Sequence, residues 1–384
     1  MRHRAVTSGP PPILTPGCGE DFGSSFSCHR ILRDADLPAS DPRIVDIAIL
    51  DMHHDWPNLG LDSLVRGAGE IARDLQPLLE TAGLRIRALS YDVRRSRAVP
   101  APPGSRHMIY IGSGGPGSID PRANDGHSAG TQGILEDPAW EEPAFRLFSS
   151  ILHHPDAVLL AVCHTFGVLC RWAGIAVPVL RPAEKGGKSS GIVQNWLTDE
   201  AVSHPWFSRF AALSDGRRFS VLDSRLYDLV PVSRPFPAGI VPLSYEADPA
   251  EGRRDNALTM VEYARDKDGV MPRMLAVNHH PEIRDRRRQR RILDLKLARG
   301  DVSREWYEER SRSLVQGLEN PAFEYRVLLT SQFTLIAPLR FHLYRQVRVR
   351  AEQMGFACDL HEEMVLQHPS GTLDREENGT GIDD

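Results

Sequence analysis

Apolar residues in the first half of the chain form short runs separated by segments with helical spacing. Four short apolar runs predict strands, at residues 43–52, 84–91, 106–112 and 156–163. Between the first two, apolar residues over 61–79 recur at the spacing of an amphipathic helix, which Gly83 is expected to end in the left-handed conformation. Further helices are expected after Asp137-Pro138 and after Cys163. This alternation predicts an α/β fold with an open, mostly parallel sheet and helices on both faces.

The second half of the chain changes character twice. Residues 175–280 hold short strand-like runs with Gly, Pro and Asp between them, which predicts an antiparallel addition and the last strands of the sheet. From residue 281 the spacing becomes helical. The sequence therefore predicts four segments: a mobile leader (1–40), an α/β domain (41–283), a helical C-terminal extension (284–367) and a disordered acidic tail (368–384).

Composition narrows the class of protein. Hydrophobic residues make up 41% and charged residues 25%, as in ordinary soluble globular domains, and a net charge of −5 provides no general attraction to nucleic acid. No apolar run reads as a secretory signal or a membrane span. The 5 cysteines are scattered and include no Cys-x-x-Cys pair, which argues against a disulfide framework or a zinc site and favours a reducing, cytoplasmic compartment.

The stretch "LLAVCHTFG" places Cys163 where a predicted strand meets a predicted helix. Backbone N–H groups and the positive end of the helix dipole favour the reactive thiolate there. The N–H of His164 would point to where an oxyanion forms. The alternative is an ordinary buried thiol, as for Cys170, which falls two turns along the same helix.

Two further stretches carry candidate chemistry at strand ends. "YIGSGGPGSID" (110–120) lets the backbone approach a ligand closely and lacks the Gly-Lys-Ser/Thr of a nucleotide-binding loop. "LAVNHHPEI" (275–283) ends a strand in His280, with Glu282 two residues on. Such a histidine can move the proton of a thiol, and the carboxylate can orient its ring. Each stretch, taken alone, also fits an ordinary surface loop.

Taken in order, the Gly-Gly-Pro turn, the cysteine and His-Pro-Glu resemble the class I glutamine amidotransferase-like superfamily over residues 43–283. "VSHPWF" (202–207) resembles a further stretch of that family. The resemblance implies a flavodoxin-like sheet without cofactor or metal. By position, the resemblance implies that Cys163 is the nucleophile, His280 the base and Glu282 the group that orients it. It also implies an oxyanion hole formed by the N–H groups of Gly115 and His164, and a substrate-binding loop that includes Gly114 and Pro116.

The chain departs from the family pattern near the cysteine. The family's elbow usually reads Gly-x-Cys-x-Gly-x-Gln, whereas here Thr165 replaces the second glycine and Gly167 the glutamine that helps hold substrate. The family's Ser-His pair before a later strand is Ser224-Arg225 here, and Arg225 is a candidate to bind a substrate carboxylate bidentately. We therefore expect acyl-transfer machinery with an altered substrate-binding shell at Gly167 and Arg225.

Three functions remain open from the sequence. The first is a glutamine amidotransferase or amidase that acts on a small amide, such as glutamine, and supplies ammonia to a synthetase on a separate chain. The second is another acyl-cysteine enzyme, such as a γ-glutamyl hydrolase or a homoserine acyltransferase. The third is a binding or regulatory protein without efficient turnover.

The run "RDRRRQRR" (284–291) is better explained as a solvated helix face than as a nucleic-acid site. The pairs His53-His54 and His153-His154 lack carboxylates at metal-ligand spacing.

Overall fold

The computed structural model covers most of the chain between residues 23 and 356. The described residues are 23–55, 58–104, 106–183, 187–214, 216–232, 235–247, 254–300, 302–316, 318 and 320–356. Residues 1–22 of the predicted leader and the predicted acidic tail lie outside them.

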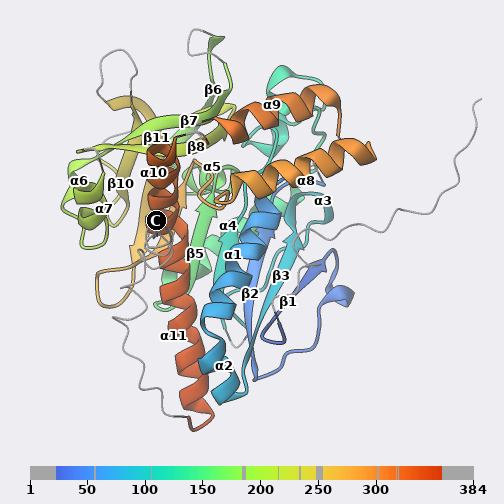
Figure 1. Ribbon diagram of the computed structural model, residues 1–384, viewed down its shortest axis with the longest axis vertical. Coiled ribbons are helices and arrows are strands. Elements are labelled where there is room, and N and C mark those ends of the chain that lie inside the picture. Colours follow the sequence, from blue (N-terminus) through green and yellow to red (C-terminus); the bar gives the residue numbers. More distant parts are fainter. Residues whose placement is uncertain are drawn as a thin grey trace, which may run out of the picture.

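Twelve strands within the described residues form one mixed sheet (Figure 1). They are β1 (Phe26–Ile31), β2 (Ile44–Asp51), β3 (Arg85–Asp92), β4 (His107–Gly112), β5 (Val158–Val162), β6 (Ala176–Leu180), β7 (Ser189–Leu197), β8 (Arg218–Arg225), β9 (Tyr227–Pro231), β10 (Val241–Ala247), β11 (Arg254–Arg265) and β12 (Pro272–Val277). The order β1-β3-β2-β4-β5-β12 is parallel throughout. The sheet then continues antiparallel through β11, β10, β7 and β8, with β9 and β6 as a side branch. The predicted antiparallel addition is therefore confirmed.

Helices cover both faces of the parallel strands, as predicted. The helices and short helical turns of the α/β part are η1 (Asp34–Asp36), α1 (Gly60–Asp74), α2 (Gln76–Ala82), α3 (Val93–Ser96), η2 (Pro121–Ala123), η3 (Ala129–Thr131), η4 (Pro138–Trp140), α4 (Glu141–His153), α5 (His164–Trp172), α6 (Asp199–Val202) and α7 (Phe207–Leu213). Alternate residues of β2 supply the two layers, since Ile47 and Ile49 belong to the core under α1, and Ala48 and Leu50 to the core under α4 and α5. Gly83 ends α2 at φ 62°, in the expected left-handed conformation.

The N-terminal part of the described chain differs from the prediction. Residues 26–31 fall within the segment predicted as a mobile leader, yet they form edge strand β1, parallel to β3. Alternate residues Phe26 and Cys28 pack against the core and Ile31 is buried, which holds the segment in place.

Cys28 is disulfide-bonded, whereas Cys163 and Cys170 carry free thiols. The expectation that the cysteines are reduced therefore does not hold for Cys28.

The C-terminal residues form the predicted helices. They are α8 (Arg286–Arg299), α9 (Arg304–Val315), α10 (Pro321–Ser331), a π-helical turn, η6 (Gln332–Ile336), and α11 (Ala337–Gln353). Pro338 lacks an N–H group and its ring crowds the preceding turn, which explains the widened π turn. The indole N–H of Trp206 bonds the carbonyl oxygen of Phe333 within that turn, at 2.9 Å.

The C-terminal helices pack against the rest of the fold. Phe333, Leu339 and Leu343 belong to the same buried cluster as α1 and the parallel strands, and α11 runs beside α1 along the sheet (Figure 1). Helices α8 and α9 lie near the N-terminal end of α1 (Figure 1). They pack through Leu293 and Leu314 against Leu59, which directly precedes α1. No helix among the described residues combines the length and apolar character of a membrane span.

Candidate active site

The register of the parallel strands brings three loops to one edge of the sheet. Gly112 at the end of β4 pairs with Ala161 of β5, and Val162 of β5 pairs with Val277 of β12. The N–H of Cys163 extends this ladder by donating to the carbonyl of Val277 at 2.8 Å. The glycine turn, Cys163 and the His-Pro-Glu stretch therefore leave the sheet side by side, where open α/β sheets bind ligands.

Cys163 has an unusual backbone conformation. Its φ is 49° and its ψ is −100°, a region that residues other than glycine rarely occupy. Hydrogen bonds hold it there on both sides: its N–H bonds Val277, and its carbonyl accepts from the N–H of Gly167 at 3.1 Å. The turn leaves the thiol half-buried at the start of α5. Strain that the surrounding structure imposes on a single residue is a feature of functional sites.

His280 and Glu282 form a hydrogen-bonded pair beside Cys163. The Nδ1 atom of His280 lies 2.8 Å from Oε1 of Glu282, whose side chain is fully buried. Burial alone would lower the pKa of His280, but the charges of Glu282 and of the Cys163 thiolate, with hydrogen bonds to both groups, raise it well above 6.5. The arrangement favours a protonated His280 ring oriented by a carboxylate.

The glycine turn fits against this pair because it has no side chains. A Cβ atom on Gly114 would lie 3.0 Å from Cε1 of His280 and 3.4 Å from Cβ of Cys163. A Cβ atom on Gly115 would lie only 2.9 Å from the carbonyl carbon of Met52. Glycine therefore lets the turn approach His280 and Cys163 at position 114 and the Met52 backbone at position 115.

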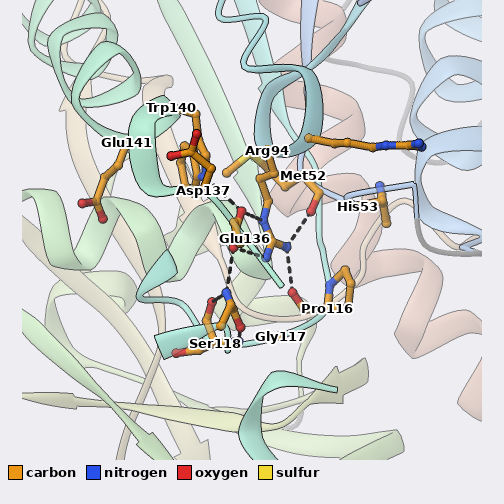
Figure 2. A network of polar contacts seen from close by, with 12 residues as sticks. Met52, His53, Arg94, Pro116, Gly117, Ser118, Glu136, Asp137, Trp140 and Glu141 are labelled. Atoms are coloured by element: carbon orange, nitrogen blue, oxygen red, sulfur yellow. Dashed lines mark hydrogen bonds and ion pairs between the residues drawn. The ribbon is translucent and has the colours of Figure 1, made fainter. Parts of the chain in front are cut away.

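A buried ion pair supports the turn from behind. Figure 2 shows the Arg94 guanidinium, which contacts Glu136 through two N–H groups at 2.6 and 2.7 Å, with both side chains fully buried. Its third nitrogen donates to the carbonyls of Met52 and Pro116, at 2.8 and 2.7 Å (Figure 2). Trp140 donates to the same carboxylate at 2.9 Å. The network fixes the position of Pro116, so this residue has a structural role whether or not it contacts substrate.

The two amide groups proposed to stabilise an oxyanion lie at the same cavity. Gly115 and His164 both line it, next to Cys163. Among the described residues neither N–H has a backbone acceptor, and His164 is the first residue of α5, where helical N–H groups have no partner within the helix. Their role in binding an oxyanion stays a prediction.

The side chain of His164 is a buried neutral imidazole. It is 1% exposed, and neither ring nitrogen has a hydrogen-bond partner among the described residues. Burial is the largest cause that lowers its pKa well below 6.5, and the positive charges of Arg94, His53 and Arg171 act in the same direction. A neutral ring next to Cys163 does not compete with His280 for the proton of the thiol.

The two departures from the family's elbow pattern have different structural consequences. Thr165 is buried against Gly112, and its hydroxyl donates to the carbonyl of Ser113 at 2.7 Å. Gly167 does not line the cavity, because a Cβ atom there would lie 2.8 Å from Cδ1 of Ile119. The apolar Ile119 lines the cavity where the resemblance would place a glutamine side chain.

A cavity of about 300 Å³ lies over Cys163. Its floor is formed by the three loops, and much of its wall is apolar: Leu59, Ile119, Leu222, Leu226, Leu229, Ile283 and Leu314. Helix α9 closes one side through Trp306, Glu309, Arg310, Ser313 and Leu314. Their spacing of three and four residues places them on one helical face, so the sequence did contain a signal for this wall.

The sequence analysis did not identify the charged residues that α9 and β7 bring to the cavity. Lys188, just before β7, pairs with Glu309 at 2.5 Å, and the Arg310 guanidinium donates to the hydroxyl of Ser224. Burial and the charge of Arg310 lower the pKa of Lys188, against the opposing effects of Glu309 and the Cys163 thiolate. These groups come from distant segments of the chain, so sequence proximity could not reveal their juxtaposition.

Arg225 reaches the cavity, but its charge is already compensated. It is 3% exposed and pairs with Asp223 at 3.3 Å, Asp228 at 3.1 Å and Glu246 at 2.6 Å. Its ability to bind a substrate carboxylate stays a prediction, which this pairing disfavours because a new carboxylate would compete with three existing ones.

His53 also lines the cavity, paired with a carboxylate. Its Nδ1 atom lies 2.9 Å from Oδ1 of Asp51. Burial alone would raise the pKa of Asp51, but hydrogen bonds and the charge of His53 lower it overall. No group of three or more metal-ligating side chains is found in the part of the chain that the structure describes.

Comparisons with known proteins provide little further support. No family model and no curated protein matches the sequence. The solved structures similar to this one include a putative GMP synthase subunit from Thermoplasma acidophilum, at 12% identity over 62% of this chain and 85% of that chain, with a TM-score of 0.35. SMU.1228c matches at 12% identity over 81% of this chain and 100% of that chain, with a TM-score of 0.40. A putative ThuA-like protein from Bacteroides uniformis matches at 11% identity over 64% of this chain and 84% of that chain, with a TM-score of 0.31. These similarities are too weak to carry an argument about function.

Proposed function

We propose that this protein is a cysteine-dependent amidase or amidotransferase of the class I glutamine amidotransferase-like type, acting on a small amide through a Cys163 thioester. The observation that carries the proposal is the strained Cys163 beside the His280–Glu282 pair. Across the sheet, five parallel strands lie in the order β3-β2-β4-β5-β12. When they are numbered 1 to 5 along the chain, this order is 2-1-3-4-5. This order supports a flavodoxin-like core.

The first half of the proposed reaction forms the thioester. The thiolate of Cys163 attacks the amide carbon, and the N–H groups of Gly115 and His164 bind the resulting oxyanion. The C–N bond breaks as the imidazolium of His280 protonates the departing nitrogen, which leaves as ammonia or an amine. Glu282 keeps the ring in the required orientation.

The second half releases the acyl group. Neutral His280 takes a proton from water, whose oxygen attacks the thioester carbon, and the C–S bond breaks to regenerate the thiolate. The products are a carboxylic acid and the released ammonia. If the ammonia is used in synthesis, a separate chain is the acceptor. Another acyl acceptor in place of water would make the same site an acyltransferase.

Ammonia release from a panel of small primary amides tests this proposal. Wild type is expected to release ammonia from at least one amide, and Cys163→Ala from none. Cys170→Ala is the matched control, because its thiol is buried in the same helix away from the cavity. In parallel, iodoacetamide should alkylate Cys163 faster than the same cysteine in unfolded protein. If the folded protein reacts no faster, the proposed nucleophile is wrong.

A further inference from the structure

The charged groups around the cavity leave one cation without a carboxylate partner. Among the described residues that line the cavity, the carboxylates are Asp223 and Glu309, and the lysine and arginine side chains are Lys188, Arg225 and Arg310. Asp223 pairs with Arg225, and Glu309 pairs with Lys188. The charge of Glu309 acts on Arg310 as well, but no side-chain contact at ion-pair distance joins Arg310 to a carboxylate in the described part of the chain.

Arg310 is positioned to bind a ligand. Its guanidinium donates to the hydroxyl of Ser224 and lies 5.6 Å from the centre of the Trp306 ring. A guanidinium has five N–H donors, so most remain open to a planar acceptor such as a carboxylate. Burial lowers the pKa of Arg310 despite the opposing charges of Glu309 and the Cys163 thiolate, so the guanidinium is held in a poorly solvated place. An anion from the substrate would offset that cost.

Arg310 also lies within electrostatic reach of the nucleophile. The negative charge of the Cys163 thiolate acts on both Arg310 and Lys188. Arg310 and Cys163 line the same cavity of about 300 Å³. One small molecule can therefore present its amide to Cys163 and an anionic group to Arg310.

The same cavity has no free group for an ammonium among the described residues. Asp223 is bound by Arg225 and by the hydroxyl of Ser189 at 2.6 Å. Glu309 is bound by Lys188 at 2.5 Å. An α-amino acid would bring an ammonium that finds both carboxylates already paired, at a desolvation cost with no compensating ion pair.

We propose that Arg310 selects the substrate: the acyl donor is an amide with an anionic group, such as a carboxylate, at its far end and without an ammonium group. The apolar walls at Ile119, Leu222 and Leu229 contact the body of the molecule. This inference rests on the proposed function. It assigns substrate recognition to α9, outside the 43–283 region that carries the family resemblance.

Alkylation of Cys163 by a matched pair of reagents tests the inference without a known substrate. Iodoacetate and iodoacetamide both form a C–S bond as iodide leaves, and they differ in carrying a carboxylate or a neutral amide. In wild type, the rate ratio of iodoacetate to iodoacetamide at Cys163 should exceed that for the unfolded protein. In Arg310→Gln it should fall about tenfold, and because both reagents attack the same thiol, the ratio is independent of any general change in Cys163 reactivity.

Matched variants sharpen this test. Arg304→Gln removes an exposed charge from the first position of the same helix and should leave the ratio unchanged. Arg310→Lys keeps a charge and should retain part of the selectivity. Glu309→Gln frees Lys188 from its partner, so the ratio should rise. Peptide mapping assigns alkylation to Cys163 and separates it from reaction at the other cysteines.

Turnover gives a second readout. Glutaric acid monoamide should be hydrolysed with a higher kcat/KM than L-glutamine or neutral pentanamide, and Arg310→Gln should remove that advantage. If iodoacetamide alkylates Cys163 readily but the ratio is equal in Arg310→Gln and Arg304→Gln, the anion site is overturned and the proposed function stands. If iodoacetamide does not react faster with folded protein than with unfolded protein, both proposals fall.

Discussion

Thr165 occupies the space that a side chain on Gly112 would need. A Cβ atom built on Gly112 would lie 2.7 Å from both Cβ and Oγ1 of Thr165. Gly112 ends β4 and Thr165 is the second residue of α5, so their contact joins the strand to the elbow helix. The family pattern has a glycine on the helix at the position of Thr165. In this protein the glycine of the contact is Gly112 on the strand, and the close packing of strand and helix is preserved.

Gly112→Ala is therefore expected to lower the free energy of unfolding by about 1–3 kcal/mol, because the added methyl group overpacks the interface. In Gly112→Ala/Thr165→Gly the loss should be smaller than the sum of the single changes, by about 1 kcal/mol or more. Urea unfolding of the four proteins measures this coupling. Strict additivity would show that the two positions do not share this space.

Replacing the strained cysteine tests its backbone conformation. Cys163→Gly should be more stable than Cys163→Ala by about 1 kcal/mol, since glycine reaches φ 49° and ψ −100° without the steric cost of a Cβ atom. Cys170 is the control, because it lies in the same helix at an ordinary helical position. There glycine should be less stable than alanine. The reverse order at position 163 would contradict a strained elbow.

The buried Arg94–Glu136 pair supports the glycine turn from behind. Arg94→Met should destabilise the protein by about 3–5 kcal/mol, because it leaves a fully buried carboxylate without its partner. Arg94→Met/Glu136→Met should recover a large part of that loss. Arg146→Met, which removes one side of an exposed ion pair with Glu142, should have little measurable effect on thermal unfolding. Equal losses in both single variants would show that the pairing does not matter.

The His280–Glu282 contact predicts a specific titration. In wild type His280 should titrate well above pH 6.5, and in Glu282→Gln its midpoint should fall, because the carboxylate is one of the groups that raise its pKa. The stability that the raised pKa contributes is fully present below pH 6.5 and disappears as pH rises through the folded-state value. The advantage of wild type over Glu282→Gln should therefore shrink with increasing pH.

Proton NMR of the histidine rings measures these midpoints. His279 is the internal control, because burial and the nearby charges of His280 and Arg225 lower its pKa to about 3. It should stay neutral above about pH 5 in both proteins. A wild-type midpoint for His280 at or below 6.5 would contradict the raised pKa of this histidine.

Local sequence patterns specified many of the individual elements of this protein. The four strands predicted in the first half are present as β2, β3, β4 and β5, and the residues after 281 are largely helical, as their spacing predicts. These predictions succeed because burial on one or two faces imposes a period on the sequence. The order of the Gly-Gly-Pro turn, Cys163 and His280 at successive strand ends also indicated one shared edge, which the parallel register provides.

The surroundings of the cysteine, in contrast, follow from tertiary packing. The spacing of α9 indicates a helix face but cannot say that this face closes the cavity, because its contacts with Lys188 and Ser224 join distant segments. Likewise, Arg225 reads as a free cation in the sequence, and its three carboxylate partners meet it only in the folded sheet. Edge strand β1 forms because β3 offers an unpaired edge. Periodicity records which faces are buried, whereas the packing of elements distant in sequence determines which charges meet.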